Sequence, residues 1–566
     1  MENRRFILIA LLGVVLFFMY QAWQKDHAPA SAPLPTPAAN TAALDVPSAA
    51  NEHADVPSAA TTAATAQTPA EAAPAISGQR VSVDTDLLRV EIALDGGDLR
   101  RVDLKNYAVS KDQPDVPRAL LDDRNGRYFV LQSGLAGAKA PLLTHRTKFS
   151  AAQSEYRLAD GSDMLDVVLE YQDAGGASAR KIYRFKRGSY GVELIHEFHN
   201  GSGEDVTASP YVRLVRTAFN YGDEPPFVAT FTGVGFYEQK EAGGEAYKFV
   251  KTKLENLGED GYEKSQTGGW IAMLQHHFVA AILPTAGEPA TYTAKPAAAG
   301  QGYMAQYVGA AQKLAAGQDG RFSTALYLGP KLQDRVASIA PGFDLTLDYG
   351  ILTPLSEPLF WVLNKMHSLT GNWGVAIILL TLLVKAAMYK LSEAQYRSMA
   401  KMKKFAPKIQ DLKERYGDDR ERMQKAMMEL YKKEGFNPLA GCWPLLVQFP
   451  VFIALYWVLL ESVELRQAPF MLWLQDLTSP DPYYVLPVLF GISMFFQQKL
   501  SGQQIADPMQ QKVMNIMPIM LTAFFTFFQS GLVLYWFVSN LIGIAQQWVI
   551  TRRLETAEAA KSVAKR

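Results

Sequence analysis

Five apolar runs between residues 372 and 550 constrain this chain more than any other feature. They are Trp373–Tyr389, Trp443–Leu460, Tyr483–Gln498, Val513–Gln529 and Leu532–Ile550. Each approaches the roughly 20 residues that an α-helix needs to cross the hydrocarbon core of a bilayer. The whole-chain composition, 48% hydrophobic and 20% charged, conceals these runs, because residues 78–350 have the mixed composition of a soluble domain. The fold class predicted is therefore a polytopic α-helical membrane protein with a large extramembrane domain.

A further apolar run, from Phe6 to Tyr20, follows Arg4 and Arg5 at the N-terminus. Such a segment is either a cleaved signal peptide or a retained anchor. The small residues at 27–32 would suit cleavage, but the length of the run and its aromatic end favour retention. We therefore predict a transmembrane anchor at residues 1–23, which brings the number of spans to six. Residues 24–77 are rich in Ala and Pro and predict a disordered linker.

Residues 78–350 show the alternation of apolar and polar side chains that is typical of strands. The clearest examples are Val81–Asp86, Leu88–Leu94, Met164–Tyr171, Lys181–Phe185 and Tyr190–Phe198. Many short strands at regular spacing predict a large β-sandwich.

Sequence motifs give this β-domain no catalytic role. His196 and His199, and likewise His276 and His277, are separated by odd offsets, which on a strand place the side chains on opposite faces and disfavour metal binding. No phosphate-binding loop, zinc-protease or nucleophile-elbow motif occurs. The single cysteine, Cys442, excludes a disulfide framework, and the zero net charge excludes a strongly basic protein that binds polyanions in bulk. We expect no cofactor, no metal and no enzymatic activity.

Residues 351–371 predict an amphipathic helix that lies along the bilayer surface. Its apolar residues recur at helical spacing. They are Leu355, Leu359, Phe360, Val362, Leu363 and Met366.

The distribution of charge predicts the topology. If both termini are cytoplasmic, the inner segments 1–5, 390–440, 499–512 and 552–566 contain 22 basic and 12 acidic residues. The short outer loop 461–482 contains one basic residue, Arg466, and four acidic ones. This bias follows the positive-inside rule and places residues 24–350 outside, which in a bacterium is the periplasm.

Polar side chains within the five C-terminal spans concentrate in the half nearer the cytoplasm. They are Lys385, Gln448, Gln497, Gln498, Asn515, Asn540, Gln546 and Gln547. Polar groups in hydrocarbon are costly unless they are paired or hydrated, so we predict a water-filled hollow that opens inward and is sealed outward. Lys385 is the one charge well inside these spans. It could supply a fixed positive charge to the hollow, or its stem could reach the bilayer surface.

Residues 391–436 predict a cytoplasmic helical hairpin, with Gly417 ending its first helix and Asp418 capping its second. A basic patch near the bilayer contains Lys401, Lys403, Lys404 and Lys408. This patch could contact phospholipid, or it could bind a partner such as the ribosome or the targeting machinery. The short basic tail at 551–566 would add only a weak contact.

Several long strings resemble the YidC-type membrane protein insertases, the bacterial members of the YidC/Oxa/Alb family. These strings are Gly268–Gln275, Gln395–Met402, Asn437–Cys442, Val463–Phe470, Lys499–Ile516 and Ser530–Asn540. The resemblance extends from the N-terminal anchor to the last span and is weakest over the linker.

The resemblance implies a function and an architecture. The implied function is insertion and folding of nascent membrane proteins in the inner membrane, alone or with the Sec translocon. The implied architecture is a periplasmic β-supersandwich and a five-helix core (372–550) around a hydrophilic groove. Lys385 matches the position where the family usually carries arginine, so charge attraction is kept but the planar guanidinium is lost. Thr381 lies in the same motif, and Tyr535 and Trp536 match the family's substrate-contacting aromatic residues.

Two other classes of function remain open from the sequence. A channel or small-solute transporter would show inverted repeats and paired intramembrane charges, and we find neither. A membrane-anchored carbohydrate-binding protein would lose its function if most of residues 78–340 were deleted, whereas an insertase would keep it.

Overall fold

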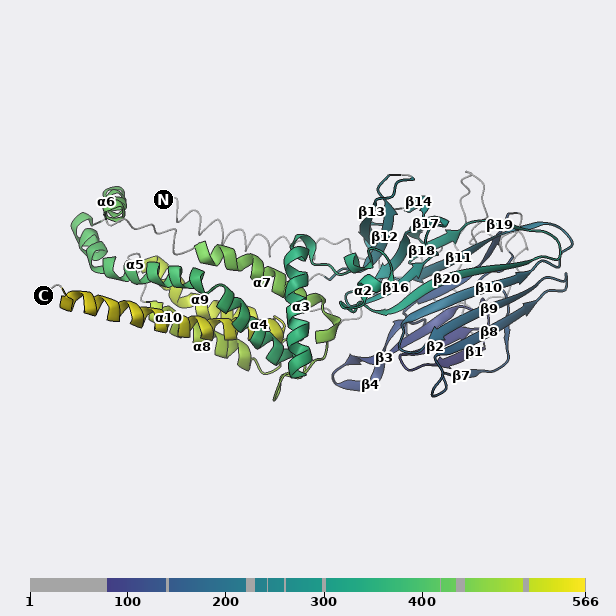
Figure 1. Ribbon diagram of the computed structural model, residues 1–566, viewed down its shortest axis with the longest axis horizontal. Helices are drawn as coiled ribbons and strands as arrows, with labels where there is room; N and C mark the ends of the chain where they lie inside the picture. The colour runs from purple at the N-terminus through teal and green to yellow at the C-terminus, as the bar shows by residue number, and fades with distance from the viewer. Residues whose placement is uncertain are drawn as a thin grey trace, which may run out of the picture.

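The computed structural model describes residues 79–138, 142–219, 230–241, 243–258, 261–297, 302–417, 419–433, 443–501 and 508–564. The predicted anchor (1–23) and linker (24–77) lie outside the described residues. Strands occupy one end of an elongated molecule and helices the other, and the short helix α2 and helix α3 lie where the two parts meet (Figure 1).

In the part of the β-domain that the structure describes, twenty strands form two sheets. The first sheet contains β1(Arg80–Asp84), β2(Leu88–Ala93), β3(Leu99–Ser110), β4(Gln113–Leu121), β5(Phe129–Gly137), β7(Glu155–Arg157), β11(Val206–Arg216), β14(Tyr262–Thr267), β17(Pro289–Pro296), β18(Tyr303–Gly309) and β19(Gln312–Leu314). The second contains β6(Ser150–Ala151), β8(Met164–Gln172), β9(Ser178–Lys186), β10(Gly191–His199), β12(Gly233–Gln239), β13(Tyr247–Lys253), β15(Trp270–Leu274), β16(Phe278–Leu283) and β20(Asp319–Pro330).

The sheets are antiparallel except where β1 pairs with β7. Alternation of side chains produces the core as the sequence predicts: along β10 the apolar residues Val192, Leu194 and Phe198 are buried, and Glu193 and Glu197 are half-buried. One core cluster draws residues from both sheets, including Val90 and Leu131 from the first and Ile271 and Leu326 from the second. The prediction of a β-rich domain is confirmed.

The four histidines considered as metal ligands behave differently from one another. His196 is buried, and His199 on the other face of β10 contacts Asp319 with its Nδ1 atom 2.7 Å from Oδ1. His276 and His277 contradict the prediction of opposite faces. They lie in the turn between β15 and β16 rather than within a strand, and their rings stack with centroids 3.8 Å apart. Strand alternation therefore does not apply to this pair.

The helices comprise one short helix within the β-domain and, after β20, several short helices followed by longer ones. These are η1(Leu254–Asn256) within the β-domain, α2(Val336–Ile339), η3(Phe343–Thr346), η4(Gly350–Leu352), α3(Thr353–Thr370), α4(Trp373–Ala387), α5(Tyr389–Tyr416), α6(Arg420–Lys433), α7(Trp443–Glu461), η6(Val463–Leu465), α8(Val485–Ser501), α9(Pro508–Phe525) and α10(Ser530–Ala564).

Two helix ends differ from the prediction. The fifth predicted span ends at Phe525 rather than Gln529, and Ser530 and Gly531 belong to the first turn of α10. In the hairpin, Gly417 has the left-handed φ of 52° that ends α5. At the start of α6, Oδ1 of Asp419 accepts the Arg422 N–H at 3.1 Å, and the predicted cap, Asp418, lies outside the described residues.

Helix α3 runs across the bundle at its junction with the β-domain (Figure 1). Phe360 and Leu363 are buried on one side, whereas Trp361 and Leu369 are exposed on the other. A helix with apolar side chains on its outer face fits the predicted position at a bilayer surface.

By length and composition, the described residues contain one helix long and apolar enough to cross a membrane, Ser530–Thr556. A second candidate is the pair Trp373–Ala387 and Tyr389–Ser398, which is bent by 64°. Three shorter apolar helices, Val447–Glu461, Val485–Leu500 and Lys512–Phe525, complete the bundle. The number of six spans stays a prediction.

Candidate functional site

Lys385 lies in the last turn of α4 and extends toward α7. Its Nζ atom is 3.5 Å from Oε1 of Gln448, in a partly buried position. The α4 backbone adds a second link: the Lys385 carbonyl accepts a hydrogen bond from Nε2 of Gln546 on α10 at 3.4 Å. Tyr535 on α10 is buried, and among the described residues its hydroxyl has no hydrogen-bond partner. Lys385, Gln448 and Gln546, the inner polar cluster, join the three helices α4, α7 and α10.

A second polar contact group lies between α8, α10 and the start of α5. Nδ2 of Asn540 donates to Oγ of Ser493 at 2.7 Å, and both side chains are buried. The Tyr396 hydroxyl donates to the Gly543 carbonyl at 3.1 Å and also interacts with Gln497. Sequence reasoning identified Asn540 and Gln497 but missed Ser493 and Tyr396. Tyr396 falls in the cytoplasmic hairpin, and a lone serine in an apolar run gives no signal of its own.

The remaining predicted residues occupy other environments. Thr381 is buried, and its hydroxyl donates to the Ile377 carbonyl within α4 at 2.7 Å. Asn515 is exposed on α9. Trp536 packs among aromatic rings, with its centroid 4.7 Å from that of Phe452 and 5.7 Å from that of Phe525. None of the contacts described for these three residues involves Lys385.

The opposite end of the bundle is apolar and tightly packed. Leu455 and Leu459 of α7 and Leu532 and Val533 of α10 are at most 1% exposed, and all belong to one apolar core cluster. The bundle therefore combines hydrogen-bonded polar groups at one end with a packed apolar core at the other.

The described residues show no candidate metal site in this region. Among them, no group of three or more His, Cys, Asp or Glu side chains could hold a metal ion. The partner found for the Lys385 ammonium is a neutral amide, which leaves the positive charge available to attract an anionic group.

Two family models together match nearly all of the described chain. Residues 80–362 match the model described as the YidC periplasmic domain, and residues 365–558 match the 60Kd inner membrane protein. The membrane protein insertase YidC of Nitrosococcus oceani is 45% identical over 557 residues, which cover 98% of this chain and 99% of the relative. The chain belongs to the YidC insertase family.

A second relative agrees with this membership. The insertase YidC of Pseudomonas putida strain W619 is 44% identical over 98% of this chain and 99% of its own length. A solved structure, described as an active YidC insertase crystal structure with the first transmembrane domain resolved, covers 83% of this chain and 92% of its own, with 18% identity and a TM-score of 0.39. YidC proteins of this kind are inner-membrane proteins with a periplasmic domain, so the strands β1 to β20 form a periplasmic domain.

Proposed function

We propose that this chain inserts and folds membrane proteins through a hydrated, inward-open groove that contains Lys385. The function requires no covalent step. A nascent segment enters the groove from the cytoplasm, and Lys385 with the neighbouring amides solvates its polar or acidic flank while that flank crosses. The observation that supports this proposal best is the contact of Lys385 with Gln448 at one end of a bundle whose other end is apolar.

The physical basis is a shorter path through low dielectric. A charged side chain at the centre of a bilayer costs about 2.5–3.5 kcal/mol on insertion scales and more in simulations. If the inner half of the path is hydrated, only the outer half has to be crossed without water. The packed leucines of α7 and α10 would form this outer part and prevent leakage.

The apolar part of the client would leave sideways into lipid, along α7 and α9. Helix α7 packs against α3, and α9 packs against α8. Phe449 on α7 and Ile516 and Ile519 on α9 are more than half exposed. An apolar client segment would therefore find apolar side chains along this route.

The finer layout also belongs to this proposal. It comprises six spans with both termini in the cytoplasm, the anchor 1–23, the linker 24–77 and the β-domain 78–350, then the interfacial helix 351–371, the core 372–550 and the tail 551–566. Thr381, Gln448, Gln497, Asn515, Tyr535, Trp536 and Asn540 would line the groove with Lys385. Nascent membrane proteins are its clients, and the Sec translocon, the ribosome or targeting machinery at 391–436, and phospholipid are the proposed partners.

The test uses Lys385→Ala and Lys385→Arg in the full chain. Charge attraction predicts that Lys385→Ala slows insertion of a single-span client with an acidic tail, whereas Lys385→Arg keeps the rate. Insertion into proteoliposomes is measured by protease protection, with Lys365→Ala on the surface helix α3 as the matched control. Insertion at the unmodified rate by Lys385→Ala would contradict the proposal.

A further inference from the structure

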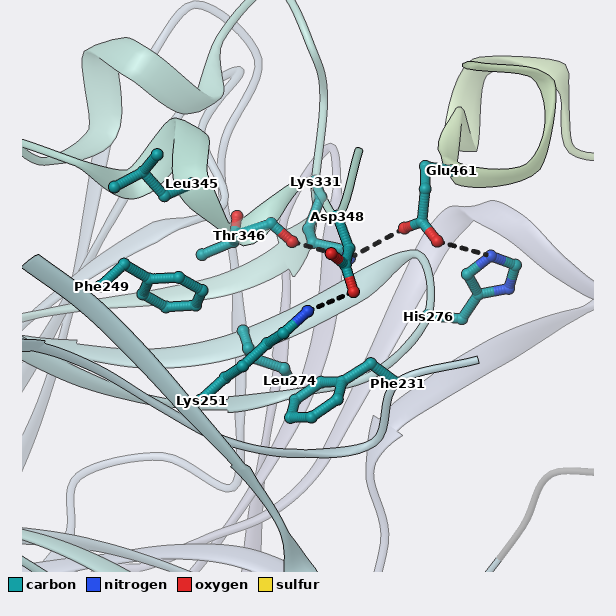
Figure 2. Close-up of a pocket in the computed structure, with 10 residues that line it drawn as sticks. All are labelled: Phe231, Phe249, Lys251, Leu274, His276, Lys331, Leu345, Thr346, Asp348 and Glu461. Carbon is teal, nitrogen blue, oxygen red and sulfur yellow. Dashed lines mark hydrogen bonds and ion pairs between the residues drawn. The ribbon is translucent and has the colours of Figure 1, made fainter. Parts of the chain in front are cut away.

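The periplasmic end of α7 meets the β-domain through charged and polar side chains. Glu461, the last residue of α7, lies between His276 and Lys331 (Figure 2). Its Oε2 is 3.6 Å from Nζ of Lys331, and its Oε1 is 3.7 Å from Nε2 of His276. Nε2 of His277 donates to the carbonyl of Leu460 at 3.0 Å, since a carbonyl can only accept. We call His276, His277, Lys331 and Glu461 the interdomain cluster.

The charges of the interdomain cluster are deeply buried. Lys331 is 3% exposed and Glu461 is 4% exposed. Lys331 also donates to the Thr346 carbonyl at 3.2 Å. A second ion pair, Lys251 with Asp348, lies at the same cavity, so that two cations face two carboxylates (Figure 2). Removal of Lys331 alone or of Glu461 alone would therefore leave one charge of the site without its partner.

Residues just after α7 extend the same attachment. The Gln333 N–H donates to Oε1 of Glu464 at 2.8 Å, and the Gln333 side chain also bonds Ser462 and Tyr349. Further along, Arg466 donates to the Ala108 carbonyl at 2.7 Å. Apart from the bond between Gln333 and Tyr349, every contact in this paragraph joins a residue between 462 and 466 to a part of the chain more than a hundred residues away. The end of α7 is thus held from several directions.

We propose that Lys331 and Glu461 are positioning residues that fix the depth and rotation of α7, the helix whose other end presents Gln448 to Lys385. Thirteen helical positions separate Gln448 from Glu461, a distance of about 20 Å along the axis. A buried ion pair is satisfied only in a narrow range of geometries, whereas apolar contacts tolerate sliding. The ion pair therefore selects one placement of α7. The inference rests on the proposed function only where it concerns insertion.

The test places a reporter on α7 and disturbs only its far end. Val451 lies one turn from Gln448 and is half-buried. A Val451→Cys reporter in a Cys442→Ser background is labelled with a soluble maleimide in proteoliposomes. Lys331→Met and Glu461→Gln should each change the labelling rate several-fold. Lys331→Arg should keep the labelling rate of the unmodified reporter protein. The double variant that exchanges the two charges, Lys331→Glu with Glu461→Lys, should also show that rate.

The matched control is Arg184→Met, which removes an ion pair with Asp166 on the surface of the same domain, at 2.8 Å. It should leave the labelling rate unchanged. If Lys331→Met and Glu461→Gln are present in the membrane at normal abundance and are labelled at the unmodified rate, the inference is overturned. It is also overturned if neither Lys331→Arg nor the charge exchange shows the unmodified labelling rate. Insertion by Lys385→Ala, measured by protease protection, tests the proposed function separately, because that variant keeps the interdomain cluster.

Discussion

Single buried hydrogen bonds hold the polar groups of the bundle in place. Asn540 is 9% exposed and Ser493 is 5% exposed, and the bond between them is short at 2.7 Å. Because both side chains are almost fully buried, an Asn540 amide that loses Ser493 gains little contact with water in its place. Ser493→Ala should therefore lower the free energy of unfolding by about 1 kcal/mol. Reversible unfolding in mixed micelles measures this, with the exposed Ser368→Ala of α3 as the control. Equal stability of the two variants would contradict the prediction.

Gly491 marks a close approach of α8 to α9. A Cβ atom built on Gly491 would collide with the hydroxyl oxygen of Thr522. Gly491→Ala should therefore destabilise the protein, by about 1–3 kcal/mol as is usual for overpacking. Thr522→Ala removes the colliding atom, so the double variant should regain most of the loss. Thermal unfolding in detergent tests this pair, and a double variant as unstable as Gly491→Ala would show that the strain has another origin.

At the level of elements, the sequence predicted those helices and strands whose positions follow from the spacing of apolar residues. The apolar runs predicted α4 and α7 to α9 within a few residues, and alternation predicted β10 and its neighbours. Helix α10 begins near its predicted start but extends to Ala564, well beyond the predicted end at Ile550. The error concerned His276 and His277, which lie in a turn rather than in a strand.

The candidate site was predictable to a similar degree. Lys385 and Gln448 were identified because polar residues are rare in apolar runs, and the structure brings them together. The interdomain cluster was missed, because Lys331 and Glu461 are separated by 130 positions and neither lies in a distinctive local pattern. Contacts of this kind depend on how the two domains pack against each other, and the hydrophobic periodicity of the sequence carries no information on that packing.

The element η6 carries a carboxyl group with a strongly shifted pKa. Burial raises the pKa of Glu464 to about 7, from an ordinary value of 4.5. The folded state therefore binds this proton more tightly than the unfolded state, and its contribution to stability is complete below pH 4.5 and lost as the pH rises to about 7. Glu464→Gln should remove that component.

The expected measurement is a smaller fall in melting temperature between about pH 5 and about pH 7.5 for Glu464→Gln than for the unmodified chain. His276 acts in the opposite direction, because burial lowers its pKa to about 3, and stability is lost as the pH falls below 6.5. Burial lowers the pKa of His277 in the same way. Since both proteins keep these histidines, the difference between the two pH profiles isolates Glu464. Parallel profiles would show that Glu464 keeps its ordinary pKa.

At the scale of the whole molecule, the β-domain and the bundle meet in a way that makes a small change more harmful than a large one. Lys331→Met leaves the Glu461 carboxylate buried beside apolar groups without its cation, a change that typically costs about 3–5 kcal/mol. Deleting residues 80–335, which removes β1 to β20 together with Lys331 and Gln333, instead exposes Glu461 to water, where an unpaired carboxylate costs little.

We therefore expect insertion activity to decrease in the order unmodified chain, deletion variant, Lys331→Met. The deletion loses the attachment of α7 but keeps the inner polar cluster of Lys385 and Gln448, so it should retain part of the activity. Protease protection of the acidic-tailed client, at matched amounts of each protein in the membrane, measures the order. Complete inactivity of the deletion variant would instead show that the periplasmic domain takes part in insertion directly.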